Sequence, residues 1–280
     1  MGCDFLTFND IIIALRDAGV ETPEFDAQIL LEHFCAVRPH QLPFLREKDF
    51  DCDDLHRAVQ KRASRYPLQY IIGSWAFMTE EYKVNEHCLI PRQDTELLVE
   101  TAIRALPKNA RFADLCTGSG CVAVSTLSAR TDCHALALDI FPETLALACE
   151  NAEKNGVSDR FTAALADVLS EPDEKIKKLA PFDAILSNPP YIQTEVVKTL
   201  SPEVRCEPEA ALDGGGDGLD FYRAILDFYT PLLTDSGFFA FEIGYDQGQD
   251  LRDLAASKGF TCEILADLSG NDRTAILKKA

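Results

Sequence analysis

Short apolar segments alternate with longer, helix-like segments from residue 111 onward, and each apolar segment ends in glycine, acidic or amide residues. The apolar segments are 111–116, 135–139, 161–166 and 182–187. Apolar runs of this length, separated by helical stretches, are typical of buried parallel strands with crossover helices. We therefore expect an α/β fold with helices on both faces of one sheet. The polar strand ends should gather at one edge, where open sheets bind ligands.

The first strand runs into a glycine-rich turn, Cys116-Thr117-Gly118-Ser119-Gly120, which precedes a helix rich in small residues. The two glycines permit close approach of a ligand to the backbone, and the helix N-terminus behind them offers free N–H groups. The second strand ends at Asp139, roughly 20 residues later, a spacing at which a carboxylate can accept hydrogen bonds from ribose hydroxyls. The third strand ends in Asp167-Val168. These features predict a nucleoside cofactor, either a nicotinamide dinucleotide or S-adenosylmethionine.

The fourth strand end carries the tetrapeptide Asn188-Pro189-Pro190-Tyr191. Prolines cannot continue a sheet ladder, because they have no N–H to donate, so strand 182–187 stops abruptly. The Asn188 side-chain oxygen and the Pro189 carbonyl can accept the two hydrogens of a planar –NH2 group, and the Tyr191 ring can pack against its plane. A proline-rich turn without function is the alternative interpretation. Together with the upstream turn, the tetrapeptide favours S-adenosylmethionine over a dinucleotide.

Taken together, these motifs make the chain similar to the release-factor glutamine methyltransferases, the HemK/PrmC type of class I S-adenosylmethionine-dependent methyltransferases. The similarity covers nearly all of the chain. One departure is Cys116, where the family usually has glycine; its Cβ either crowds the methionine part of the cofactor or is accommodated as a small side chain. The matching segments are 89–96, Asp114 to Gly120, Asn188 to Tyr191, Glu207-Pro208, Ala211-Leu212, Gly215, Asp217 to Leu219, Glu242 to Gly244, Gln247-Gly248, Asp267-Leu268 and Gly270 to Arg273.

The resemblance implies a Rossmann-like, seven-stranded methyltransferase sheet whose last strand is antiparallel. It also implies methylation of the side-chain amide nitrogen of the Gln in the Gly-Gly-Gln loop of translation release factors, with S-adenosyl-L-methionine as methyl donor and peptide chain release factors as protein substrates. The catalytic residues are then Asn188, Pro189 and Tyr191, and the substrate-binding residues are Asn188, Pro189, Pro190 and Tyr191. The cofactor-binding residues are Cys116, Thr117, Gly118, Ser119, Gly120, Asp139, Asp167, Val168 and Asn188.

The charge balance separates two substrates that an Asn-Pro-Pro-Tyr loop can serve. Adenine methyltransferases of DNA also use such a loop, since an exocyclic adenine amine and a carboxamide are both planar nitrogens. A DNA enzyme needs basic residues to neutralise phosphates, whereas this chain has 27 basic and 46 acidic residues. We therefore expect a protein substrate and no stable nucleic acid binding. The alternatives are an adenine-N6 methyltransferase of nucleic acid and a non-catalytic translation-factor adaptor.

The pattern along the chain predicts a small helical domain before the methyltransferase core. Thr7 and Asp10 have the spacing of a capping box, Pro23 begins a second helix, and 51–65 forms a third. Alternating aromatic and β-branched residues in 71–90 predict a hairpin. The expected parts are a helical substrate-recognition domain (1–75), a hairpin and linker (76–110), and an S-adenosylmethionine-dependent methyltransferase domain (111–280).

Two local segments carry further expectations. The basic residues Arg57, Lys61, Arg62 and Arg65 share one face of the third predicted helix, which we interpret as a solvated face or a docking surface for an acidic protein. The triplet Gly214-Gly215-Gly216 is expected to be a short flexible loop.

The cysteines argue for a reducing compartment. No two of the ten have the Cys-x-x-Cys spacing of a zinc site, so we expect free thiols and no metal. His33 and Cys35, on a predicted helix, form the only cluster that suggests a metal. Since no apolar run approaches the length of a membrane helix, the expected localisation is cytoplasmic.

Overall fold

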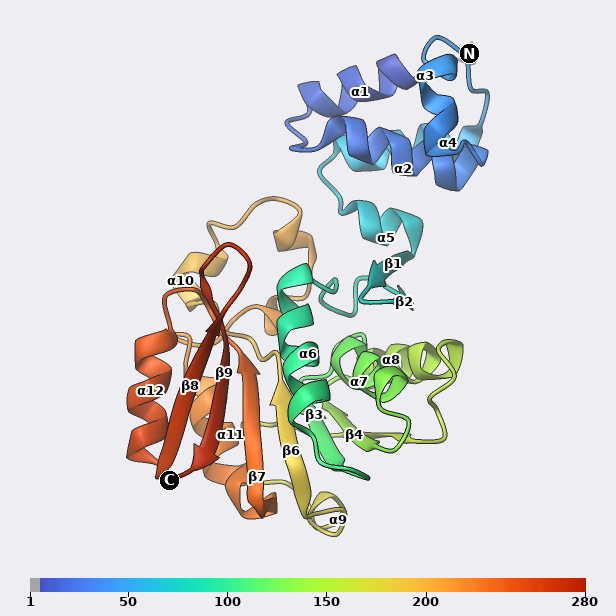
Figure 1. Cartoon of the computed structure of the whole chain (residues 1–280). Coiled ribbons are helices and arrows are strands. Elements are labelled where there is room, and N and C mark those ends of the chain that lie inside the picture. Colours follow the sequence, from blue (N-terminus) through green and yellow to red (C-terminus); the bar gives the residue numbers. More distant parts are fainter. Residues whose placement is uncertain (1–5) are drawn as a thin grey trace. The chain divides into compact units, whose positions relative to one another are not determined.

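The computed structural model describes residues 6–280, which divide into two compact units. The helical unit comprises residues 6–74 together with Ser201–Cys206, and the sheet unit comprises Trp75–Leu200 together with Glu207–Ala280. Each unit has a hydrophobic core of its own. Figure 1 shows the helices and strands of both units. Among the described residues, no helix is long and apolar enough to cross a bilayer.

The helical unit is built from short amphipathic helices around a core of leucine and isoleucine. The predicted capping box is confirmed: the Thr7 hydroxyl accepts from the Asp10 N–H at 3.1 Å, and the Asp10 carboxylate accepts from the Thr7 N–H at 3.0 Å. Pro23 occupies the first turn of the second helix, as predicted. The helices are α1 (Phe8–Asp17), α2 (Pro23–Cys35), α3 (Leu42–Leu45), α4 (Asp53–Ala63) and α5 (Leu68–Ile72), with a 3₁₀ turn, η1 (Pro39–Gln41).

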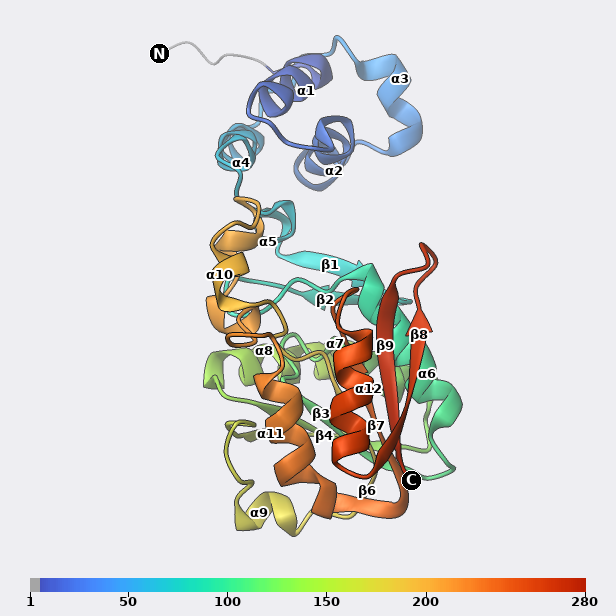
Figure 2. The same ribbon diagram turned by 90° about the vertical axis from the view of Figure 1, so that its left-hand side faces the viewer.

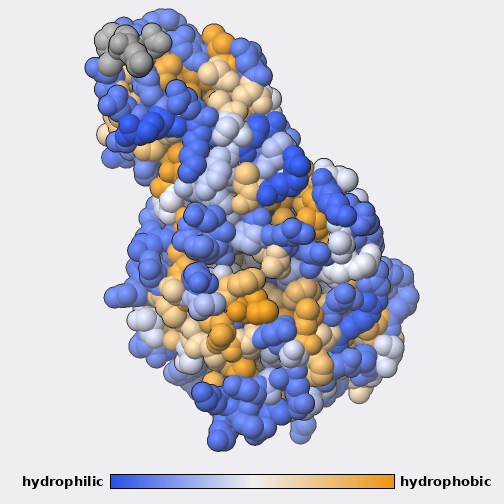
Figure 3. All heavy atoms as spheres, turned by 180° about the vertical axis from the view of Figure 1, so that it is seen from behind, coloured by the Kyte–Doolittle hydropathy of each residue, from blue (hydrophilic) through white to orange (hydrophobic). Residues whose placement is uncertain are grey.

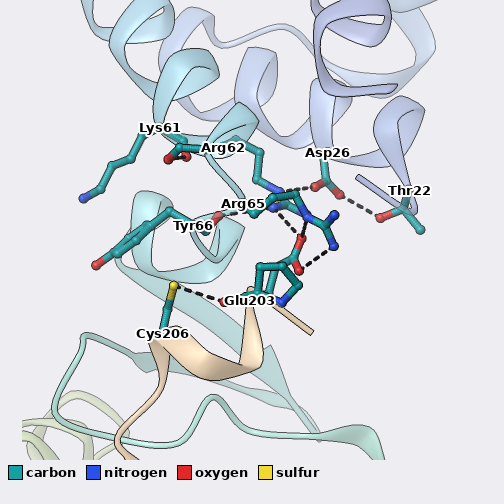
Figure 4. A network of polar contacts seen from close by, with 10 residues as sticks. Thr22, Asp26, Lys61, Arg62, Arg65, Tyr66, Glu203 and Cys206 are labelled. Atoms are coloured by element: carbon teal, nitrogen blue, oxygen red, sulfur yellow. Dashed lines mark hydrogen bonds and ion pairs between the residues drawn. The ribbon is translucent and has the colours of Figure 1, made fainter. Parts of the chain in front are cut away.

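The basic residues at the end of α4 take part in an internal ion network, so the prediction of a solvated face is wrong for Arg62. Its side chain is buried, with Nε 2.6 Å from Asp26 Oδ2 and Nη1 3.0 Å from Glu203 Oε1. Arg65 donates to the same glutamate, with Nη2 2.7 Å from Oε2 (Figure 4). Because a buried guanidinium needs a partner, this network binds segment 201–206 into the helical unit.

The sheet unit has the predicted seven-stranded sheet, in the order β5-β4-β3-β6-β7-β9-β8. Strands β3 to β7 are parallel, and the last strand, β9, is antiparallel to both of its neighbours. The predicted hairpin is a separate two-stranded sheet of β1 (Ser74–Phe77) and β2 (Glu80–Lys83). The seven strands are β3 (Arg111–Leu115), β4 (His134–Asp139), β5 (Phe161–Leu165), β6 (Phe182–Ser187), β7 (Leu233–Glu242), β8 (Phe260–Ala266) and β9 (Asp272–Lys279).

Helices cover both faces of this sheet (Figure 2). In β7, Phe238 and Ala240 pack in the core on one face, whereas Phe239 and Phe241 pack in the core on the other. Since both faces are buried, the strands read as continuous apolar runs. One face carries α6 (Glu96–Ala105), α7 (Cys121–Ala129) and α8 (Pro142–Lys154), and the other carries α9 (Glu174–Lys177), α11 (Asp220–Tyr229) and α12 (Gly248–Ser257). The connection after β6 contains α10 (Thr194–Val197).

Candidate active site

A cavity of about 430 Å³ lies where the parallel strands end. The segments that line it follow β3, β4, β5 and β6 directly, which places it at the carboxyl edge of the sheet. Its wall includes three large apolar side chains that remain accessible, Ile140, Phe141 and Leu169. Figure 3 shows hydrophobic residues gathered in the middle of one face of the sheet unit. A partly apolar cavity with a few polar groups suits a nucleoside-sized ligand.

Most of the sequence-predicted site residues line this cavity. Three do not: Gly120, Pro189 and Tyr191 lie next to lining residues but not in the wall itself. The predicted residues in the wall are Cys116, Thr117, Gly118, Ser119, Asp139, Asp167, Val168, Asn188 and Pro190.

Glycine occupies two positions of the turn after β3 for different structural reasons. Gly118 has φ +56°, and an added Cβ would meet no atom within 4 Å, so the space beside its backbone is open to a ligand. Gly120 has φ +81°, and an added Cβ would lie 3.2 Å from the Ala148 Cβ, so this glycine lets α7 approach α8. Cys116 also has a left-handed backbone, with φ +57°, which explains why glycine suits this position.

Two carboxylates hold the turn in place. Asp114 is buried and accepts from the Thr117 hydroxyl at 2.6 Å and the Ala123 N–H at 3.2 Å, and burial raises its pKa to about 7. Asp139 accepts from the Gly118 N–H at 3.0 Å and the Phe141 N–H at 3.2 Å. Burial raises the pKa of Asp139, and the backbone N–H donors oppose that rise. Each Asp139 oxygen keeps acceptor capacity for a ligand in the cavity.

Asp167 and Val168 form the neighbouring part of the wall. The Asp167 carboxylate accepts from the Leu169 N–H at 2.9 Å and from the Ser170 hydroxyl at 3.2 Å, which shapes the turn after β5. Val168 is buried and presents an apolar surface. This combination suits a flat heteroaromatic base.

Side-chain hydrogen bonds hold the Asn-Pro-Pro-Tyr segment at its first and last residues. Asn188 donates from Nδ2 to the Thr95 hydroxyl at 3.1 Å, and the Tyr191 hydroxyl donates to Glu242 Oε1 at 3.2 Å. Within residues 6–280, no donor forms a hydrogen bond with Asn188 Oδ1 or with the Pro189 carbonyl. These two oxygens are therefore free acceptors at the end of β6, among the described residues.

The glycine-rich segment 214–218 packs against the backbone of Tyr191 and Ile192. This packing corrects the expectation that Gly214-Gly215-Gly216 is a flexible loop. The Gly214 N–H donates to the Ile192 carbonyl at 2.8 Å, and Ile192 forms a parallel bridge with Asp213. An added Cβ at Gly218 would lie 2.4 Å from the Tyr191 carbonyl oxygen. The segment contains glycine because two backbones meet there.

Sequence reasoning assigned no role to Thr95 or Glu242, although both fall in segments that carry the family resemblance. Thr95 lines the cavity, and Glu242 lies beneath Tyr191. One signal was available for Glu242, because an acid ends the apolar run 238–241 of β7. In the part of the chain that the structure describes, no group of three or more His, Cys, Asp or Glu could hold a metal, and none of the nine cysteines forms a disulfide.

Comparison with known proteins adds sequence evidence to this geometry. The model of the PrmC N-terminal domain matches residues 8–73, and the model of the methyltransferase small domain matches residues 93–218. The release factor glutamine methyltransferase of Moorella thermoacetica is 41% identical over 92% of this chain and 92% of that one. The chain belongs to the release factor glutamine methyltransferase family. Its relative of the same name in Caulobacter vibrioides is 36% identical over 94% of this chain and 91% of that one.

Solved methyltransferase structures share the fold. The hMettl16 catalytic domain superposes with a TM-score of 0.53 at 17% identity, covering 81% of this chain and 82% of that one. A methyltransferase from Pyrococcus furiosus gives a TM-score of 0.53 at 16% identity, covering 72% of this chain and 89% of that one. As a member of the release factor glutamine methyltransferase family, the chain is a methyltransferase enzyme.

Proposed function

We propose that this enzyme methylates the side-chain amide nitrogen of the Gln in the Gly-Gly-Gln loop of translation release factors, with S-adenosylmethionine as methyl donor. The observation that carries the proposal is the pair of free acceptors at the end of β6, Asn188 Oδ1 and the Pro189 carbonyl. A primary carboxamide presents two N–H donors in one plane, which two neighbouring acceptors can hold. The names of the sequence relatives support the release factor as substrate.

The cavity residues fit S-adenosylmethionine. Asp139 would accept from the ribose hydroxyls, and Asp167 with Val168 would flank the adenine. The turn Cys116-Thr117-Gly118-Ser119-Gly120 would contact the methionine part, where the open space beside Gly118 gives room for it. When bound, S-adenosylmethionine supplies a methyl group on a sulfonium, which is a strong electrophile.

An amide nitrogen is a poor nucleophile, because its lone pair is shared with the carbonyl. The protein therefore contributes mainly by positioning, which is worth up to ~7–11 kcal/mol in favourable systems. Asn188 Oδ1 and the Pro189 carbonyl would hold the –NH2 hydrogens and favour the positive charge that develops on nitrogen. Tyr191 would pack against the amide plane. No general base is required before transfer, since the methylated nitrogen is acidic and loses its proton to water.

We also propose that the helical unit recognises the release factor. A Gln side chain offers little surface, so specificity must come from contacts beyond the reacting amide. The helical unit contains the match to the PrmC N-terminal domain and exposes three large apolar side chains, Ile13, Phe25 and Phe44. Exposed aromatic side chains are frequent at protein interfaces.

The decisive experiment combines the enzyme, labelled S-adenosylmethionine and three candidate acceptors: a full-length release factor, duplex DNA and RNA. Mass spectrometry then locates the methyl group. We expect one methyl on the Gln of the Gly-Gly-Gln loop and none on nucleic acid. Methylated adenine with an unmodified release factor would replace the proposal by the nucleic-acid alternative.

A further inference from the structure

Thr95 and Glu242 connect two residues of the substrate loop to each other through buried polar contacts. Asn188 Nδ2 donates to Thr95 Oγ1 at 3.1 Å, and the Tyr191 hydroxyl donates to Glu242 Oε1 at 3.2 Å. The other oxygen of this carboxylate, Glu242 Oε2, is buried and has no hydrogen-bond partner among the described residues. The Thr95 hydroxyl lowers the pKa of Glu242, so it is the nearby donor that Oε2 can accept from. Thr95 is 1% exposed and Glu242 is 2% exposed, so water does not compete for these contacts.

Glu242 is held in place from the opposite side as well. The Tyr222 hydroxyl donates to the backbone carbonyl of Glu242 at 2.8 Å, which fixes the end of β7. The Arg273 guanidinium of β9 favours the ionised carboxylate, whereas Asp94 in the 3₁₀ turn η2 (Gln93–Thr95) opposes it. Tyr191, Tyr222 and Cys121 also interact electrostatically with it. Glu242 is therefore a buried acid that stabilises a neighbouring loop instead of facing solvent.

The charge state of Glu242 decides which way the hydrogen bonds run. A carboxylate only accepts, so the ionised Glu242 gives the Thr95 hydroxyl an acceptor, the unpartnered Oε2, toward which it would turn its single proton. Thr95 Oγ1 can then only accept from Asn188, which forces the asparagine to present Nδ2 to Thr95 and Oδ1 to the cavity. Thr95 makes no competing cap bond to α6, although it stands at its N-terminus. An asparagine turned the other way would present two donors to the substrate amide and repel it.

We propose that Thr95 and Glu242 are positioning residues, which fix the orientation of the Asn188 carboxamide and the Tyr191 ring so that Asn188 Oδ1 accepts from the substrate amide. The inference rests on the proposed function of Asn188. It assigns to both residues an effect on methyl transfer that is much larger than any effect on cofactor binding.

Thr95→Val removes the hydroxyl at nearly constant volume, and Thr95→Ser keeps it. With a full-length release factor and saturating S-adenosylmethionine, we expect Thr95→Val to lower kcat about tenfold or more, because a misplaced reacting group costs rate steeply. Thr95→Ser should restore most of the loss. The cofactor Kd, measured by calorimetry, should stay within about twofold in both variants, since neither removes a predicted cofactor contact.

A double-mutant cycle shows whether Thr95 acts through Asn188. If it does, Thr95→Val should have no further effect on the residual kcat of Asn188→Ala. If the two single-variant losses in kcat multiply in the double variant, the inference is overturned. An unchanged kcat in Thr95→Val would overturn it as well. If Asn188→Ala itself has full activity, the proposed role of Asn188 fails first, which separates the two conclusions.

Glu242→Gln offers a second, near-isosteric test. The glutamine amide can donate to Thr95, which frees the Thr95 proton for Asn188 and allows the asparagine to turn. Burial raises the pKa of Glu242 to about 7, with the Thr95 hydroxyl, Arg273 and the Tyr191 hydroxyl opposing that rise. We expect the kcat of the unaltered enzyme to rise with pH through about 7, and Glu242→Gln to be slower and lack that rise. The same pH profile in both proteins would exclude Glu242 from this role.

Discussion

Gly214 lies so close to Tyr191 that an added Cβ would be 2.7 Å from the Tyr191 Cα and 2.8 Å from the Pro190 carbonyl oxygen. Both of these atoms belong to backbone, so neither can rotate away as a side chain would. The segment after the second proline of the tetrapeptide is thus shaped by a glycine more than 20 residues downstream.

Gly214→Ala should consequently displace the Asn-Pro-Pro-Tyr backbone. We expect a loss of stability of about 1–3 kcal/mol from overpacking and a kcat lower by about tenfold or more from misplacement. Gly216→Ala is the matched control, because an added Cβ there meets nothing within 4 Å. Thermal unfolding and initial rates measure the two effects; equal behaviour of both variants would contradict the close packing.

Asp139→Ala should weaken binding of S-adenosylmethionine, because the ribose hydroxyls lose a charged acceptor worth roughly 1.5–3 kcal/mol. The same substitution frees the Gly118 and Phe141 N–H groups that Asp139 accepts from. Asp159→Ala serves as the control, since its side chain is mostly exposed and does not line the cavity. Calorimetric titration is the measurement, and an unchanged Kd for Asp139→Ala would remove this residue from the proposed site.

Asn188→Ala should separate chemistry from cofactor binding. The loss of one oriented acceptor is expected to lower kcat roughly 10²–10³-fold, by analogy with donors in oxyanion holes. Asn188→Asp should also be slow, because a carboxylate cannot donate to Thr95 as the amide does. Single-turnover rates at saturating release factor test this, and normal turnover in Asn188→Ala would refute the assigned role.

Glu203→Gln should destabilise the helical unit in a pH-dependent manner. Burial opposes ionisation of Glu203, but hydrogen bonds from Arg65 and Arg62 outweigh it and hold the pKa at about 2, below the ordinary 4.5. A carboxyl with a lowered pKa stabilises the fold above the ordinary value and loses that contribution as the pH falls through the lowered one. We expect a loss of about 1–3 kcal/mol at pH 7, since the pair is partly buried.

Denaturant unfolding at pH 7 and at about pH 2–3 tests that sign. The difference between the unaltered protein and Glu203→Gln should shrink at the lower pH. Glu195→Gln is the control, because its ion pair with Lys198 is fully on the surface and contributes little. A difference that stays constant with pH would mean that the charge of Glu203 is not what stabilises the segment.

Phe44→Ala should weaken recognition of the protein substrate alone. Phe44 is 87% exposed in the helical unit, so its removal leaves no cavity. We expect a higher KM for an intact release factor, with an unchanged cofactor Kd and unchanged activity on a short Gly-Gly-Gln peptide. Leu268→Ala, at a fully exposed apolar residue of the sheet unit, is the control. Equal loss on peptide and protein would argue that the helical unit does not select the substrate.

The four strands given bounds from the sequence differ from the structure by at most one residue at an end, and strand 182–187 has the predicted bounds. Strands buried on both faces are short and continuously apolar, which a sequence displays directly. The short helices α3 and α5 were missed, because four or five residues are too few to show a helical period. The place of segment 201–206 in the helical unit was also missed, because it depends on ion pairs between residues far apart in the chain.

The sequence by itself determined which residues stand at the strand ends, because strand length, turn glycines and prolines are local properties. It was enough to indicate the α/β class, the cavity edge and nine of the residues that line it. Only the tertiary structure decided where those side chains point. The Tyr191 hydroxyl donates to Glu242. The absence of a side chain at Gly120 leaves room for α8, not for a ligand. Both outcomes depend on the packing of segments that are distant in sequence, and no local pattern records that packing.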